Sequence, residues 1–208
     1  GSAEAISINT EKYYSDFILQ KAKFISGVFK TKHNSNYYIV GSVLTSGLII
    51  EWFMKNFKIK NYDELKYILK NAKGVEKNIF VFPQFEYSHS PINSFITKGS
   101  ISGLNRSTTN GDIYKSILEC LSFDTKNAMD FIAKKTGTKV KKFICSGGSV
   151  KNKQWMKIKS NIINKDIFVN KNFENVSLGS AILAGLASSV YLNEKDAFNQ
   201  IQNKFSII

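Results

Sequence analysis

The order of its segments predicts an α/β fold with a mixed sheet. Short runs rich in β-branched and aromatic residues occupy the chain up to residue 43, and later β runs alternate with apolar residues at helical spacing. With 208 residues, of which 43% are hydrophobic, the chain can bury a substantial core. Strands that come first and then alternate with helices are typical of α/β domains.

Four β-favouring runs open the chain, at residues 5–9, 17–20, 24–29 and 37–43. Asn, Gly, Ser and Lys residues separate these runs, which predicts a meander of short strands. Further strands are expected at 79–82, 101–104, 140–145 and 167–169. The stretch from 84 to 99, which contains Pro91, is expected to be irregular.

Apolar residues at helical spacing predict helices over 44–57 and 62–72. A long helix is expected to open at the capping signal of residues 108–110 and to end near Gly137. Further helices are predicted after the glycine pair through residue 163, over 177–191, and from about 194. The apolar face of the long helix comprises Ile113, Ile117, Leu118, Leu121, Ala128, Phe131 and Ile132.

Charge argues against a nucleic-acid partner, although the net charge is +13. Of the 29 basic residues only Arg106 is arginine, and the lysines are scattered. Base readout favours the planar guanidinium group of arginine. A surface solvated by lysine is therefore the preferred interpretation, and no nucleic acid is expected to bind.

The two cysteines, Cys120 and Cys145, lie in apolar runs and are expected to be buried thiols in a reducing compartment. No signal peptide is evident, and the apolar stretch over 178–191 is too short and too rich in Gly and Ser to span a bilayer. A soluble, cytoplasmic protein without a membrane partner is expected. Gly1 and Ser2 resemble a cloning remnant.

The strongest functional signal is the run SGGSVKN at residues 146–152, which follows a predicted strand and enters a helix. Adjacent Gly147 and Gly148 let the backbone approach a ligand closely, and the first N–H groups of the helix attract phosphate. A glycine pair also serves simple turns, so the run alone leaves both interpretations open.

Five blocks in this order resemble the C-terminal domain of the FGGY family of carbohydrate kinases, which includes glycerol kinase, xylulokinase and gluconokinase. They are AISINT at 5–10, GSVLTSG at 41–47 followed by Trp52, GSISGL at 99–104 followed by Asp112, the run at 146–152 followed by Trp155 and Met156, and LGSAILA at 178–184. The resemblance implies a ribonuclease-H-like (actin-like ATPase) domain with a mixed central sheet flanked by helices. Residues 1–208 would then form one nucleotide-binding domain of a two-domain kinase.

The resemblance also implies contacts with ATP, the expected cofactor together with Mg²⁺. Thr10 would hydrogen-bond a terminal phosphate, Gly47 would approach the ribose or phosphates, and Glu51 occupies a nucleotide-contacting position one helical turn later. Each has a structural alternative: Thr10 as a strand-end turn residue, Gly47 as a helix-packing residue, and Glu51 as a surface carboxylate.

In the glycine run, the resemblance implies that Gly147 and Gly148 lay main chain against adenine and the α-phosphate. Ser149 would lie at the mouth of the helix, and Asn152 would offer its amide to the base. Asn152 could instead cap its own helix, and the bulky Trp52, Trp155 and Met156 are expected to be core residues. No catalytic residue and no metal ligand is assigned, because the family's aspartate base would lie outside this chain.

Several positions depart from the family pattern. The run Asn9-Thr10-Glu11-Lys12 lacks two glycines of the phosphate turn, and the segment Tyr87-Ser88-His89 between the two prolines lacks an arginine. The helix after the glycine pair carries Lys157 and Ser160-Asn161 in place of Gln and Ala-Asp. These departures leave open whether the parent protein is catalytically competent.

The expected function is the nucleotide half of an ATP-dependent kinase that phosphorylates a hydroxyl of a sugar, sugar acid or polyol. Its partners would be the N-terminal kinase domain and the small-molecule acceptor, and a homodimer is left open. The fragment alone is expected to be inactive. The alternative is a diverged, non-catalytic actin-like nucleotide-binding or regulatory module.

Overall fold

The computed structural model describes residues 3–30, 34–43, 46–85, 90–92, 94, 96–170, 174–201 and 205–208. Two predicted features lie outside these residues. They are the expected cloning remnant at Gly1 and Ser2 and the segment at 87–89 that differs from the family pattern. The chain groups into two compact units: unit 1 is Gly1–Val140 with Asn161–Ile163, and unit 2 is Lys141–Ser160 with Asn164–Ile208.

Unit 1 opens with a three-stranded antiparallel sheet of order β1-β3-β2. The strands are β1 (Glu4–Thr10), β2 (Ile25–Lys30) and β3 (Ser35–Val43), which confirms three of the four predicted opening strands. In the register, Glu4 pairs with Val43 and Thr10 pairs with Tyr37. The β1–β3 pairing therefore fixes which segments of unit 1 lie at each end of the sheet.

The strand predicted at 17–20 is wrong, because these residues form helix α1 (Phe17–Lys21). A carboxylate oxygen of Asp16 accepts hydrogen bonds from Ile18 N (2.7 Å) and Leu19 N (3.1 Å), which caps the first turn. Leu19 is buried. Capping and one buried apolar contact outweigh the β preference of Phe, Ile and Leu.

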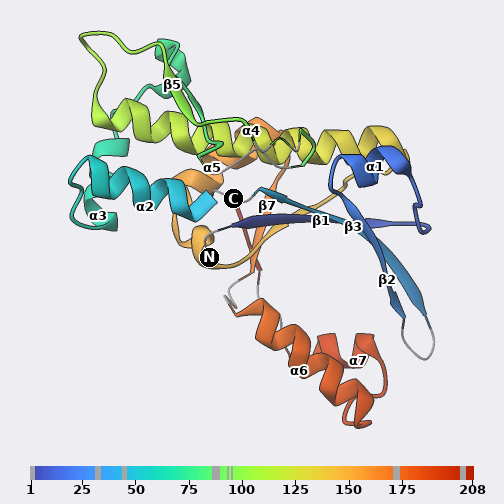
Figure 1. Ribbon diagram of the computed structural model, residues 1–208. Coiled ribbons are helices and arrows are strands. Elements are labelled where there is room, and N and C mark those ends of the chain that lie inside the picture. Colours follow the sequence, from blue (N-terminus) through green and yellow to red (C-terminus); the bar gives the residue numbers. More distant parts are fainter. Residues whose placement is uncertain are drawn as a thin grey trace. The chain divides into compact units, whose positions relative to one another are not determined.

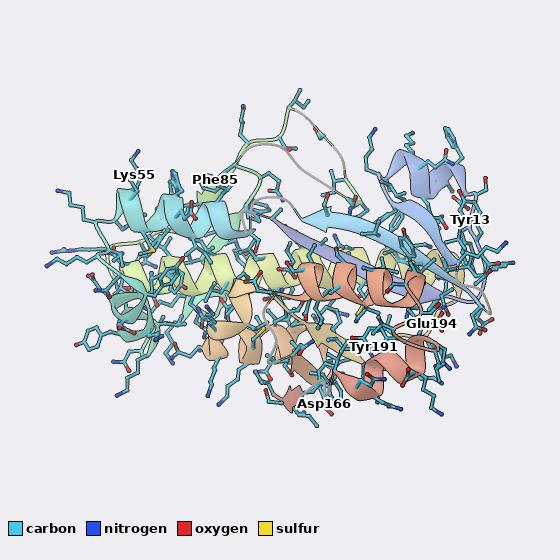
Figure 2. All side chains as sticks on the ribbon, turned by 90° about the horizontal axis from the view of Figure 1, so that it is seen from below. Tyr13, Lys55, Phe85, Asp166, Tyr191 and Glu194 are labelled. Atoms are coloured by element: carbon cyan, nitrogen blue, oxygen red, sulfur yellow. The ribbon has the colours of Figure 1, made fainter. Side chains whose placement is uncertain are left out.

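The middle of unit 1 contains α2 (Ser46–Asn56), α3 (Tyr62–Leu69), the short 3₁₀ helix η1 (Gly74–Lys77), and the antiparallel pair β4 (Phe80–Phe82) and β5 (Ser100–Ser102). These elements confirm the predicted helices and strands of this region with shorter bounds. Trp52 on α2 contacts the ring of Phe85, with the ring centroids 4.5 Å apart, and Phe85 lies beside α2 in Figure 2.

Helix α4 (Asn110–Thr136) is the central element of unit 1, where it contacts α2, α3, η1, β1, β3 and β4 (Figure 1). Thr109 and Asp112 form a capping box at its start, and Gly137 ends it with φ 73°. The predicted apolar face is confirmed: its members are buried except Phe131, whose half-buried ring stacks on Phe24 at 5.5 Å.

Buried Asp112 connects α4 to η1. It accepts hydrogen bonds from Lys73 N (2.6 Å), Lys77 Nζ (3.0 Å) and Thr109 N (3.0 Å). Burial by itself raises the pKa of Asp112, but these donors outweigh it and hold the pKa well below its usual range. The carboxylate therefore stabilises unit 1 as an anion.

Unit 2 contains a mixed sheet of β6 (Phe143–Cys145), β7 (Ile167–Asn170) and β8 (Phe205–Ile207). β6 and β7 are parallel, whereas β7 and β8 are antiparallel. This confirms the predicted mixed sheet. The observed β6 is shorter than the strand predicted at 140–145, and β8 was not predicted. The helices are η2 (Gly148–Lys151), α5 (Lys153–Ile163), α6 (Asn175–Ala187) and α7 (Glu194–Gln200).

Trp155 and Met156 of α5 are buried, with exposed fractions of 2% and 0%, as the core interpretation of these residues predicts. Helix α6 has no buried residue, although small residues were expected to pack it closely. Of its two glycines, Gly185 lies against the ring of Tyr191, which follows the helix (Figure 2), whereas Gly179 has no neighbour within 4 Å of its Cβ position. In the described part of the chain, no helix combines the length and apolar character needed to cross a bilayer.

Candidate functional site

The glycine run forms a defined turn between β6 and α5. Gly147 has φ 89° and ψ −172°, a conformation that is essentially restricted to glycine. The next residues form the single turn of η2, and its Val150 is buried with 4% exposure. Gly147 thus supplies a backbone conformation that only glycine adopts readily, and Val150 is the buried residue of the turn.

Both glycines of the pair face open space. A Cβ placed on Gly147 or Gly148 would have no atom within 4 Å, and Gly148 is exposed. Gly148 does not have a positive φ, so residues other than glycine could adopt its backbone conformation. Neither packing nor backbone geometry within the chain accounts for the missing side chain at Gly148.

Asn152 is the N-cap of α5. Its side-chain oxygen accepts a hydrogen bond from Trp155 N at 3.0 Å, and its own N–H donates to Ser149 O at 3.0 Å. Ser149 is half-buried within η2. The capping alternative for Asn152 is therefore present in the structure, and the oxygen of its amide is engaged by the helix.

Two other predicted nucleotide contacts lie on α2 in unit 1. Gly47 is half-buried in the first turn, and Glu51 is exposed one turn later. The helix follows β3 closely, and Val43 at the end of β3 pairs with Glu4. The beginning of α2 therefore belongs to the end of the sheet where β1 starts.

Thr10 lies at the opposite end of β1, where it pairs with Tyr37. Its hydroxyl donates to Lys12 O at 2.9 Å, which is the strand-end turn interpretation of this residue. A seven-residue strand spans about 20 Å. One phosphate group therefore cannot contact both Thr10 and the start of α2.

The sequence analysis did not predict one buried and one half-buried charged residue. Lys159 on α5 is 1% exposed, and its Nζ lies 5.1 Å from the centroid of the Trp155 ring. Lys159 follows Trp155 by four residues, which places both on the same face of the helix. This spacing could have predicted that Lys159 is buried. Asp124 on α4 is half-buried, and burial raises its pKa to about 6.

Metal-ligating side chains do not cluster in the described parts of either unit. No group of three or more His, Cys, Asp or Glu residues there could hold a metal ion. The two cysteines form no disulfide, and both are half-buried rather than buried as expected.

Comparisons with known proteins place these features in a family. The model of the C-terminal domain of the FGGY family of carbohydrate kinases matches residues 12–188. The glycerol kinase of Ligilactobacillus salivarius is 30% identical over 152 residues, which cover 73% of this chain and 30% of that protein. The glycerol kinase of Brevibacillus brevis is 28% identical over 174 residues, covering 82% of this chain and 34% of that protein. The chain thus spans about a third of the length of these relatives.

Solved structures agree with this placement. The crystal structure of Plasmodium falciparum glycerol kinase with ADP matches all of this chain and 41% of that one, with a TM-score of 0.86 at 25% identity. Xylulose kinase from Lactobacillus acidophilus also matches the whole chain, with a TM-score of 0.83 at 18% identity over 41% of its length, and shows the same fold. The chain is therefore a C-terminal domain of the FGGY family of carbohydrate kinases.

Proposed function

We propose that this chain is the nucleotide-binding part of an ATP-dependent kinase that transfers the γ-phosphoryl group of ATP to a hydroxyl of a small carbohydrate or polyol. The observation that carries the proposal is the open glycine pair, because Gly148 has no side chain although neither packing nor φ requires its absence. A ligand that lies against the main chain there gives a reason for glycine.

The chemistry of the turn fits an adenosine phosphate. Main chain at Gly147 and Gly148 offers a surface without Cβ atoms, and the first N–H groups of the following helix favour anionic oxygens. Asn152, the N-cap of α5, is assigned to the base, and Ser149, in η2 just before α5, is assigned to the helix mouth. The relative solved with ADP supports the choice of an adenine nucleotide.

Gly47 and Glu51 are retained as proposed nucleotide contacts of unit 1. Thr10 is assigned to the strand-end turn instead, because its hydroxyl already bonds Lys12 O and the β1–β3 register separates it from the start of α2. This assignment makes the altered turn at residues 9–12 compatible with a working kinase.

Magnesium would be brought with the nucleotide and would neutralise charge on its phosphates. We assign no ligand of this chain to it. The aspartate base and most of the acceptor pocket are assigned to the N-terminal domain of the parent protein, so the chain alone is expected to leave ATP unconsumed. Glycerol is the first acceptor to test, because the relatives at 30% and 28% identity are glycerol kinases. A reducing cytoplasm suits the two thiols, which form no disulfide.

The test compares the chain with its full-length parent. The chain should release or absorb heat when titrated with ADP and Mg²⁺, with a dissociation constant on the order of 1 mM because few contacts carry the affinity. The parent should consume ATP with glycerol or with one member of a panel of sugars and sugar acids. A parent that binds ADP without consuming ATP with any acceptor would instead be the non-catalytic, regulatory alternative.

A further inference from the structure

The outer side of α1 and the loop before it form a surface that carries none of the residues proposed to contact the nucleotide. We term it the α1 patch. Its apolar members are strongly exposed: Phe17 by 76%, Tyr13 by 52% and Ile18 by 46%. Its basic members, Lys12, Lys21 and Lys135, are also exposed.

The patch is continuous because α1 and the loop before it are fixed to the C-terminal end of α4. The hydroxyl of Tyr14 donates to Thr136 O at 2.8 Å, and Lys12 Nζ lies 5.6 Å from the centroid of the Tyr14 ring. Directly after α1, the Phe24 ring stacks on Phe131 of α4. Figure 1 shows α1 at this end of α4, and Tyr13 lies near α1 at the periphery in Figure 2.

The exposed apolar residues are not left over from poor packing. The inner side of α1 is well buried, since Leu19 and Ala22 are 2% and 5% exposed. Phe17 and Lys21 lie one turn apart on the outer side. A five-residue helix therefore holds its inner side in the core of unit 1 and presents a large aromatic ring to solvent.

The charge around the ring is positive. None of Lys12, Lys21 and Lys135 takes part in an ion pair among the described residues, and the exposed Lys23 and Lys134 beside them share this property. Nearby Glu11 and Asp16 offset part of this charge. Asp130 on α4 is paired with Lys126 at 2.7 Å.

We propose that the α1 patch binds the surface of an anionic lipid bilayer. Phe17 and Ile18 would enter the boundary between headgroups and acyl chains, while the lysines meet lipid phosphates and carboxylates. Binding to a bilayer surface needs no membrane-spanning segment. This inference is independent of the proposed kinase function.

Lipid fits the patch better than nucleic acid does. Aliphatic Ile18 gains from a hydrocarbon boundary but cannot stack on a base as an aromatic ring does. Arginine, the residue favoured for reading bases, is missing from the patch, because Arg106 is the single arginine of the chain. Lysine as a compact point charge serves an anionic bilayer equally well.

The test is sedimentation of the full chain with vesicles. It should bind phosphatidylcholine vesicles that contain about one-third phosphatidylserine, bind pure phosphatidylcholine vesicles weakly, and lose affinity as salt rises. The double substitution Phe17→Ser and Ile18→Ser should weaken binding by about tenfold, and Lys135→Gln should weaken it by several-fold. The matched control is Tyr67→Ser on α3, because Tyr67 is 79% exposed and lies outside the patch.

Circular dichroism of each variant checks that the fold is kept. Equal binding by the Phe17/Ile18 variant and the parent chain would overturn the proposal, as would the absence of binding to anionic vesicles. Binding to a single-stranded RNA with the same sensitivity to Phe17, without binding to vesicles, would assign the patch to nucleic acid. A dimer in solution that the Phe17 substitution dissociates, without vesicle binding, would assign it to a second copy.

Discussion

Four glycines of unit 1 and the glycine pair of unit 2 have opposite surroundings. A Cβ on Gly103 or Gly111 would lie 1.9 or 2.2 Å from a backbone oxygen, and one on Gly27 or Gly41 would overlap an aromatic ring. A Cβ on Gly147 or Gly148 would meet nothing within 4 Å. At these four positions of unit 1 glycine is needed because the chain itself passes close by, whereas the chain does not fill the space beside the glycine pair. This difference, rather than the presence of glycine, points to a ligand.

The largest expected effect is that of Gly103→Ala. Gly103 has φ 84°, and the new Cβ would lie 1.9 Å from Asn78 O, so the substitution adds a clash to backbone strain. We expect a loss of about 3–5 kcal/mol in the free energy of unfolding, measured by urea denaturation.

Gly137→Ala is the matched control, because Gly137 has φ 73° and no atom within 4 Å of its Cβ position. Strain alone should cost about 1 kcal/mol there. Equal losses in the two variants would show that packing does not distinguish these glycines.

The next effect concerns the anchoring of unit 1 by Asp112. Asp112→Asn keeps the side-chain shape but removes the charge that Lys77 and three hydrogen-bond donors stabilise, which should cost about 2–3 kcal/mol near pH 7. The folded pKa of Asp112 is lowered, so its contribution is present above the unfolded pKa of about 4 and is lost as pH falls through the folded value.

Urea denaturation between about pH 7 and pH 2 measures this contribution. The gap between the parent chain and Asp112→Asn should narrow on acidification. A gap that stays constant with pH would contradict the assigned charge.

A smaller effect separates the two members of the glycine pair. Gly147→Ala should cost about 1–2 kcal/mol, since its φ and ψ suit only glycine, whereas Gly148→Ala should change stability by less than about 0.5 kcal/mol. Thermal denaturation of the two variants checks this order. A larger loss of stability in Gly148→Ala than in Gly147→Ala would contradict the backbone conformation assigned to the turn.

The smallest expected effect on stability is that of Asn152→Asp, which keeps an oxygen to accept from Trp155 N. Stability should stay within about 0.5 kcal/mol of the parent chain, while ADP affinity falls because the amide donor is gone and a negative charge is added. Stability and ADP titrations measured together separate the capping role from the proposed ligand contact. Unchanged ADP affinity would leave Asn152 with the capping role alone.

Local signals made much of the fold predictable. Thr109, Asp112 and Gly137 carry standard start and stop signals, and α4 lies where they place it. The strand predicted at 17–20 failed because Asp16, a capping residue, was given less weight than the β-favouring side chains that follow it. Strand β8 forms by pairing with β7. This long-range contact cannot be predicted from the three residues of β8 alone.

The candidate site was predictable where it depends on local backbone. The open turn at Gly147 and Gly148 is set by one φ value and by the start of α5. The positions of Thr10 and Gly47 depend on the antiparallel register of β1 and β3, and pairing partners are not encoded within either strand. The placement of Lys159 in the interior likewise depends on which face of α5 is buried.

The most direct test of the central claim is calorimetric titration of the chain with ADP and Mg²⁺, compared with that of Gly148→Val. Since nothing in the chain occupies the space beside Gly148, valine should leave the unfolding transition unchanged and eliminate the heat of ADP binding. A Gly148→Val variant that folds normally and binds ADP as the parent chain does would contradict the claim that this open space is the nucleotide's place.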